Sequence, residues 1–115
     1  MNTETNKLEG RPTRVLYAPV DIFENDNGLH LRADLPGVTQ EALEIRLHEG
    51  QLDIVGRRPL NPGRGEGFIE YRRRFQVPRH VDGSKVTARL DRGVLLVDLP
   101  KADAARPRVI PIQNG

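Results

Sequence analysis

The sequence predicts an all-β fold in which short antiparallel strands form a sandwich or a barrel. Apolar and polar residues alternate along several runs, as in strands that bury one face and expose the other. These runs cover residues 29–35, 43–48, 52–55, 86–91 and 94–99. Turn-forming residues separate the runs at 25–28, 36–37, 49–50 and 91–93. The strands therefore recur at intervals of about 8 to 12 residues, which is typical of sandwiches and barrels.

The composition fits one small domain without covalent or metal cross-links. A chain of 115 residues is long enough for a single core, and it has no cysteine to form a disulfide or bind a metal. With two Tyr, three Phe and no Trp, the core must consist mainly of Val, Leu and Ile. We therefore predict neither a cofactor nor a metal site.

The charge pattern argues against a nucleic-acid partner. The 18 basic and 16 acidic residues are interspersed along the chain, whereas a phosphate-binding surface normally has a stripe of one sign. Only the three arginines at 72–74 approach such a stripe. An RNA-binding β-fold would also need exposed aromatic side chains, and we interpret the aromatic residues near these arginines as packing residues.

We expect a central β-domain with a segment at each end. Residues 1–17 are interpreted as a short flexible N-terminal arm, 18–101 as the β-domain, and 102–115 as a C-terminal extension. The stretch 57–67 contains five Gly or Pro residues and is expected to be a flexible loop. The chain starts with a polar segment, and no apolar run approaches the ~20 residues that cross a bilayer. The sequence therefore predicts a cytoplasmic protein with no membrane partner.

Several short motifs, in order along the chain, resemble one known family. They are DIFE at 21–24, ADLPGV at 33–38, FQVP at 75–78, ARLDRGVL at 88–95 and IPI at 110–112. Together they resemble the small heat-shock proteins, also called the Hsp20 or α-crystallin-domain family, over most of the chain. The resemblance implies an immunoglobulin-like sandwich of two antiparallel sheets. It also implies a stress-response chaperone with a dimer as its building block. Further assembly into a higher oligomer stays open, because the short N-terminal arm favours a small assembly and the tail motif favours a larger one.

The C-terminal motif can be explained without the family. Ile110 and Ile112 are two residues apart, so in an extended chain their side chains point the same way. Pro111 between them fixes φ and lowers the entropy lost on docking. One interpretation is a final strand packed on its own sandwich. The resemblance implies the other, a latch that binds a groove of a neighbouring subunit.

The resemblance also places a groove for the latch or for client segments between two facing edge strands. Its expected residues are Leu43, Ile45, Leu47, Val86, Ala88 and Leu90. The alternative is that these residues belong to the core. A sandwich edge that keeps apolar surface open can accept an extended segment.

The family resemblance also implies a dimer interface and a client-binding arm. Arg73 lies two residues before Phe75, where the family commonly has an interface arginine, and Glu70 is a candidate ion-pair partner for it. The expected arm residues are Leu8, Val15, Leu16 and Tyr17. The loop at 57–67 is short for the strand that bacterial and plant members exchange. Strand exchange and edge pairing near Phe75 therefore both stay open.

The leading hypothesis is an ATP-independent holdase that binds apolar segments of unfolding proteins and passes them indirectly to ATP-driven refolding chaperones. The alternative is a non-catalytic co-chaperone or adaptor sandwich that docks on a folded partner. We predict no enzymatic activity. The histidines His30, His48 and His80 lie far apart in the sequence, and there is no phosphate-binding glycine loop or nucleophile motif.

Overall fold

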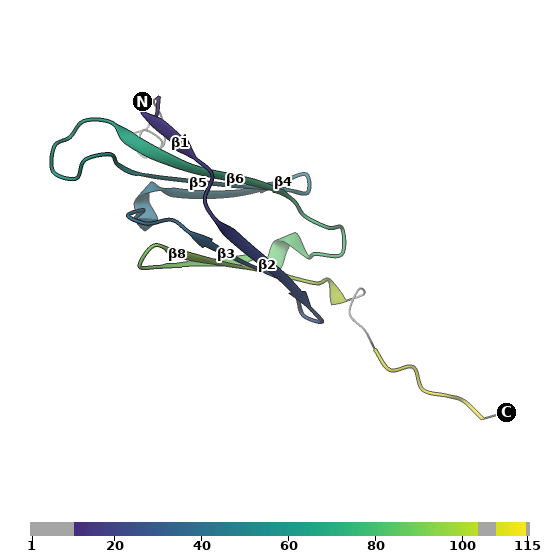
Figure 1. The fold of residues 1–115 in the computed structure, drawn as a ribbon. Coiled ribbons are helices and arrows are strands. Elements are labelled where there is room, and N and C mark those ends of the chain that lie inside the picture. Colours follow the sequence, from purple (N-terminus) through teal and green to yellow (C-terminus); the bar gives the residue numbers. More distant parts are fainter. Residues whose placement is uncertain (1–10, 104–107, 115) are drawn as a thin grey trace.

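Two four-stranded sheets face each other in the computed structural model, which describes residues 11–103 and 108–114 (Figure 1). The first sheet has the order β1-β6-β5-β4, and the second has the order β2-β3-β8-β7. The strands are β1 (Arg14–Leu16), β2 (Val20–Asn25), β3 (Gly28–Asp34), β4 (Leu43–His48), β5 (Gln51–Pro59), β6 (Phe68–Gln76), β7 (Thr87–Asp91) and β8 (Val94–Pro100). Two short 3-10 helices, η2 (Gln40–Ala42) and η3 (Gly83–Lys85), lie before β4 and β7. The predicted all-β, two-sheet sandwich is confirmed.

The core lies between the sheets and is aliphatic, as the composition requires. The largest fully buried side chains come from both sheets and from the segment after β3; they are Leu35, Leu52, Ile54, Leu95 and Val97. Strict alternation along β8 puts every second residue inside, because successive strand side chains point to opposite faces. The alternating runs found in the sequence are therefore the inner faces of the strands.

Two hairpins have the tight turns that their sequences predict. In the β4–β5 turn, Glu49 and Gly50 have φ values of 51° and 76°. In the β7–β8 turn, Arg92 and Gly93 have φ values of 48° and 79°. Two-residue loops with positive φ at both positions match the right-handed twist of the strands, and glycine adopts that φ without steric cost. These turns fix the register of both edge strands of the groove described below.

The β2–β3 turn depends on a side chain and on a close backbone approach. Asn25 Oδ1 accepts hydrogen bonds from the backbone N–H of Asn27 at 2.9 Å and of Gly28 at 3.2 Å. Gly28 has φ of 144°, and a Cβ atom there would collide with the backbone carbonyl of Leu99 in β8. Only glycine allows β3 and β8 to approach this closely.

Part of the expected N-terminal arm is instead a paired strand. β1 runs parallel to the first residues of β6, with Arg14 opposite Ile69 and Leu16 opposite Tyr71. A hydrogen bond from the N–H of Thr13 to the carbonyl of Phe68, 2.9 Å long, extends this contact. Three residues are too few to give a strand signal in the sequence, and the free edge of β6 supplies the partner. Leu8 lies outside the described residues.

The expected loop at 57–67 is shorter than predicted. β5 continues to Pro59, and Arg57 and Arg58 pair with Glu70 and Ile69 of β6. Proline is tolerated there because it is the last residue of the strand. Among the described residues, 60–67 contain no strand. No described helix has the length and apolar character needed to cross a membrane.

Candidate functional site

An apolar groove of about 340 Å³ lies between β4 and β7 on one open side of the sandwich. It is lined by Gln40, Leu43, Ile45, Ala88, Arg89, Leu90 and Leu95. Both strands are the outermost of their sheets, so the groove opens to solvent. Four of the six residues expected in a groove line it, namely Leu43 and Ile45 from β4 and Ala88 and Leu90 from β7. Ala88 is exposed and the other three are half-buried, so part of the lining is accessible.

The helix η3 limits the groove at one end. The other two expected groove residues, Leu47 and Val86, pack against the core and are not part of the lining. A Cβ atom at Gly83 would lie 3.1 Å from Leu47 Cδ2, so η3 sits directly over Leu47. Asp82 caps η3, accepting from the Ser84 hydroxyl at 2.6 Å and from its backbone N–H at 3.0 Å. These two hydrogen bonds from Ser84 lower the pKa of Asp82.

The C-terminal segment 108–114 lies away from the sandwich in Figure 1 and is exposed. Ile110 is 72% exposed, while Val109 and Ile112 are each 94% exposed. Three large aliphatic side chains within four residues are therefore in contact with water. That arrangement is unfavourable by roughly 1.5–3 kcal/mol per side chain relative to burial. The segment is a candidate docking element.

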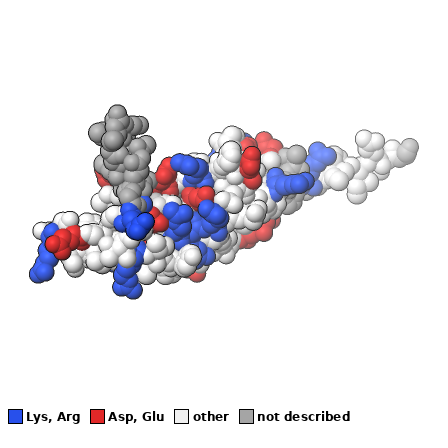
Figure 2. Space-filling view, turned by 90° about the horizontal axis from the view of Figure 1, so that it is seen from above, with Lys and Arg blue, Asp and Glu red and all other residues white. Residues whose placement is uncertain are grey.

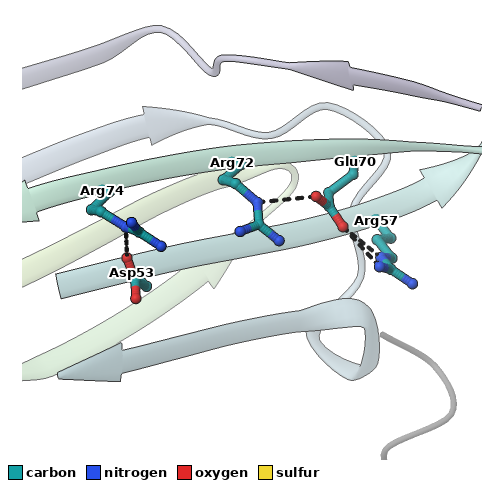
Figure 3. Close-up of polar contacts among 5 residues, drawn as sticks. All are labelled: Asp53, Arg57, Glu70, Arg72 and Arg74. Atoms are coloured by element: carbon teal, nitrogen blue, oxygen red, sulfur yellow. Dashed lines mark hydrogen bonds and ion pairs between the residues drawn. The ribbon is translucent and has the colours of Figure 1, made fainter. Parts of the chain in front are cut away.

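Glu70 is buried, and its ion-pair partners are Arg57 and Arg72 (Figure 3). The Arg57 guanidinium donates to Glu70 Oε1 at 2.8 and 3.0 Å, and Arg72 Nε donates to Oε2 at 3.1 Å. Within the chain, Glu70 therefore pairs with arginines other than Arg73, and the pairing of Glu70 with Arg73 at a dimer interface stays a prediction. The two residues are three apart in one strand, so their side chains point to opposite faces of the sheet.

Arg73 is directed toward the core side of β6, where it holds the chain crossing between the sheets. Its Nη1 donates to the carbonyl of Ala18 at 2.7 Å, and Ala18 is 1% exposed. The guanidinium also lies 5.0 Å from the ring centre of Phe75, within the range of a cation–π contact. In the isolated chain, Arg73 therefore connects β6 to the segment that leads into β2.

The outer face of the first sheet carries both positively and negatively charged side chains. Arg74 Nε donates to Asp53 at 2.8 Å, and this hydrogen bond lowers the pKa of Asp53. Arg46 donates to Glu44 at 2.7 Å on the neighbouring strand. Figure 2 shows blue and red side chains side by side on the face seen there. The interspersed charges of the sequence are therefore also mixed on this surface.

The exposed apolar side chains outside the groove and the C-terminal segment only partly coincide with the predicted client-binding arm. Of the expected arm residues, Val15 is 48% and Tyr17 79% exposed, whereas Leu16 packs against the core. Two further exposed residues, Ile22 (48%) and Phe23 (60%), lie in β2 and were not among the predicted sites. In the sequence they stood out only as part of the DIFE motif at 21–24. What exposes them is the place of β2 at the edge of its sheet.

The comparisons with known proteins place the chain in a family. Residues 21–113 match the model of the Hsp20/alpha crystallin family. The chain belongs to this family. It is 34% identical over 106 residues to the chloroplastic 26.7 kDa heat shock protein of Oryza sativa, covering 83% of this chain and 44% of that protein. It is 33% identical over 94 residues to the probable 15 kDa heat shock protein of Leptospira interrogans, covering 76% and 72%.

Solved structures of other members have the same fold. A small heat-shock protein of Xylella fastidiosa superposes with a TM-score of 0.68 at 31% identity, covering 86% of this chain and 98% of that one. The heat shock protein 16.0 of Schizosaccharomyces pombe gives a TM-score of 0.69 at 24% identity, which supports the fold alone; 85% and 99% of the two chains are covered. This Hsp20 chain matches only 44% to 62% of the length of its chloroplastic relatives. A chaperone role is supported by this family membership.

Proposed function

We propose that this Hsp20-family protein is an ATP-independent holdase that binds apolar segments of unfolding proteins and keeps them from aggregating. The observation that carries the proposal is the open β4–β7 groove together with an exposed aliphatic tail in the same molecule. A groove that takes extended apolar segments is suited to many clients, because side-chain pockets of this kind tolerate varied sequences.

The spacing of the groove matches that of the tail. Leu43 and Ile45 are two residues apart in β4, which separates their positions by about 6.6–6.8 Å along the strand. Ile110 and Ile112 have the same separation when the tail is extended. Burying both Ile side chains would contribute at most about 1.5–3 kcal/mol each. Such a contact is strong enough to hold when tethered and weak enough to be displaced by a client.

Holdase activity is tested by light scattering from a heat-labile client protein in the absence of ATP. We expect aggregation to be suppressed at near-stoichiometric ratios of chaperone to client. Unchanged scattering at a stoichiometric excess would contradict the proposal. An adaptor that docks on one folded partner would leave the aggregation of unrelated clients unchanged.

Latch binding in the groove is tested by placing a charge in its lining. Ala88→Asp introduces a carboxylate at an exposed lining position, and we expect the assembly to shrink in size-exclusion chromatography with light scattering. Thr87→Asp is the matched control, because this neighbouring residue points to the other face of β7. The double change Ile110→Ser and Ile112→Ser should reproduce the effect of Ala88→Asp. Equal assembly sizes for all variants would contradict binding of the tail in the β4–β7 groove.

For the dimer we propose edge pairing through β6, near Arg73 and Phe75. Residues 60–67 contain three Gly and one Pro and no strand, which leaves little room for an exchanged strand. β1 pairs only with Ile69–Tyr71 on the outer edge of β6. The chain lacks cysteine, so single cysteines along 72–76 report pairing directly. We expect an interchain disulfide from at least one of these positions and none from Gly63→Cys in the loop. The reverse pattern would favour strand exchange.

A further inference from the structure

The strand β2 has an open edge with unpaired backbone groups. In the β2–β3 ladder, Asp34 N–H donates to the carbonyl of Pro19, so Pro19 faces β3. Hydrogen-bonding residues alternate along an antiparallel strand, so Val20, Ile22 and Glu24 direct their N–H and C=O groups away from β3. β2 is the outermost strand of its sheet, and in the described part of the chain no strand pairs with this edge.

The edge carries two charged side chains, Asp21 and Glu24, but lacks two other features that protect such strands, a proline and a bulge. Within Val20–Asn25 there is no proline, and the register with β3 is continuous without a bulge. Both faces carry apolar surface, with Ile22 on the inner face and Phe23 on the outer face. A hollow of about 160 Å³ next to Ile22 is lined mainly by aliphatic residues together with Phe75. A continuous edge with apolar surface on both faces is a site for strand addition.

The C-terminal segment leaves the sandwich close to this edge. Lys101 N–H donates to the carbonyl of Asn27 in the β2–β3 turn at 2.9 Å, and its Nζ lies 3.5 Å from Glu24 in β2. A strand added to the outer edge of β2 would lie three strand spacings from β8, about 14 Å. The six Cα–Cα steps from Ala102 to Arg108 can span up to about 20 Å. The tail is therefore long enough to reach β2 of its own chain.

We propose that residues 108–112 fold back onto the open edge of β2 in the same chain and form an antiparallel fifth strand. The tail approaches from the turn end of β2, which sets this direction. Ile110 lies opposite Ile22, so Arg108 lies opposite Glu24 and Ile112 opposite Val20. This strand is a second docking site for the tail, separate from the β4–β7 groove.

The side chains of the two segments match in this register. Arg108, Ile110 and Ile112 point to the inner face, where β2 presents a carboxylate followed by two aliphatic side chains. Opposite charges and aliphatic pairs are the favourable cross-strand neighbours in antiparallel sheets. On the outer face, Val109 covers part of Phe23, which is 60% exposed without it.

Pro111 fits this arrangement for a separate reason. Residues 108, 110 and 112 bond with β2, so the N–H of residue 111 would point to the new outer edge. Proline has no N–H and cannot serve as a donor to a further strand. It therefore ends the sheet and protects the new edge from pairing with another chain. The inference goes beyond the proposed holdase function and stands even if the groove binds no tail.

Engineered disulfides test the register, since the chain has no cysteine of its own. Phe23→Cys with Val109→Cys forms a directly opposed pair on the outer face, with a Cα separation near 4.5 Å that allows a disulfide. Phe23→Cys with Ile110→Cys is the matched control, with nearly the same tether but opposite faces. We expect the first pair to oxidise at least about tenfold faster, since only it has disulfide geometry. Equal rates would overturn the proposal.

Mixing protein labelled with nitrogen-14 and nitrogen-15 before oxidation distinguishes the same chain from a second copy. We expect disulfide-linked species of a single isotope only, at a rate independent of concentration. Linked species of mixed isotope would show that a second copy fills the edge and would overturn the same-chain assignment.

Hydrogen exchange tests docking without cysteines. The amides of Ile22 and Glu24 should exchange about tenfold slower in the full chain than in a chain ending at Asp103, if the tail is docked roughly nine-tenths of the time. Asp21 and Phe23, which face β3, serve as internal controls and should not change. The Ala88→Asp variant should retain this protection, because it affects only the β4–β7 groove. Identical exchange at Ile22 in full and shortened chains would overturn the proposal.

Discussion

The two open sides of the sandwich differ in what crosses them. Between β4 and β7 no described segment passes over the groove, and the apolar lining is open to solvent. Between β6 and β2 the chain itself crosses from one sheet to the other at residues 17–19 (Figure 1), and Arg73 holds the crossing through the carbonyl of Ala18. One side is therefore suited to receive a foreign segment, and the other is partly closed by the molecule.

The difference shows how one small sandwich combines stability with exposed binding surface. The strand β6 borders the crossed side. It carries the Arg73 contact on its inner face and the buried Glu70 cluster on its outer face, and these hold the crossing and the first sheet in place. The uncrossed side is limited by η3 at one end, and Gln40 of η2 contributes to the lining of the groove. A rigid first side allows the second to keep apolar surface open without loss of the fold.

The largest expected effect is on β6, the strand that borders the crossed side, from Glu70→Ala. This change removes the carboxylate at the centre of a buried ion cluster and leaves Arg57, which is 8% exposed, without that partner. Breaking a buried pair typically lowers the free energy of unfolding by about 3–5 kcal/mol. Urea unfolding measures the loss. Glu44→Ala is the control, because its pair with Arg46 is exposed and should cost less than about 1 kcal/mol. Similar losses for the two variants would contradict the assigned role.

A smaller loss is expected when the crossing is released by Arg73→Ala. The buried carbonyl of Ala18 then loses its side-chain donor, which should lower the free energy of unfolding by about 1–3 kcal/mol. Arg32→Ala, at an exposed position of β3, should stay within about 0.5 kcal/mol of the parent. If both variants unfold at the same urea concentration, Arg73 does not hold the crossing.

The smallest effect is on the uncrossed side, from Asp82→Asn at the end of the groove. Because folding lowers the pKa of Asp82, its stabilising contribution is present above the ordinary value of 3.8 and is lost as pH falls through the folded value. The variant should therefore be less stable than the parent near neutral pH, and the gap should close in acid. Urea unfolding at a series of pH values measures this gap.

Asp53→Asn is the control variant. It distinguishes loss of the η3 cap at Asp82 from a general change in the pH dependence of stability. The pKa of Asp53 is also lowered on folding, so this variant should have a similarly altered pH dependence. Only Asp82→Asn should speed amide exchange at Lys85, whose N–H donates to the carbonyl of Asp82. If exchange at Lys85 is faster in both variants, the effect is not specific to the Asp82 cap of η3, and the assigned role of the cap is wrong.

Local sequence signals predicted the parts of this fold that depend on neighbouring residues. The two-residue alternation of β8 and the turn at Arg92-Gly93 follow from side-chain direction and backbone preference. They are visible without knowing any partner strand. The exposed pair Ile110 and Ile112 was likewise recognisable, because an extended segment needs no partner to set its side-chain spacing.

Contacts between distant residues could not be predicted in the same way. Arg57 was assigned to a loop because glycines and prolines follow it, but its burial depends on Glu70, thirteen residues later. β1 depends on the free edge of β6 for its pairing. Its three residues are too few to predict a strand from periodicity.

The sequence by itself determined that this chain forms an all-β fold of short strands with an aliphatic core, since hydrophobic alternation and turn residues act over a few neighbours. Only the tertiary structure decided which strands lie at the edges. An edge is the absence of a neighbour, and strand order places β2, β4 and β7 there. The surfaces open to clients and to the tail depend on that order, because a strand exposes its backbone and its flanking side chains only where no other strand pairs with it.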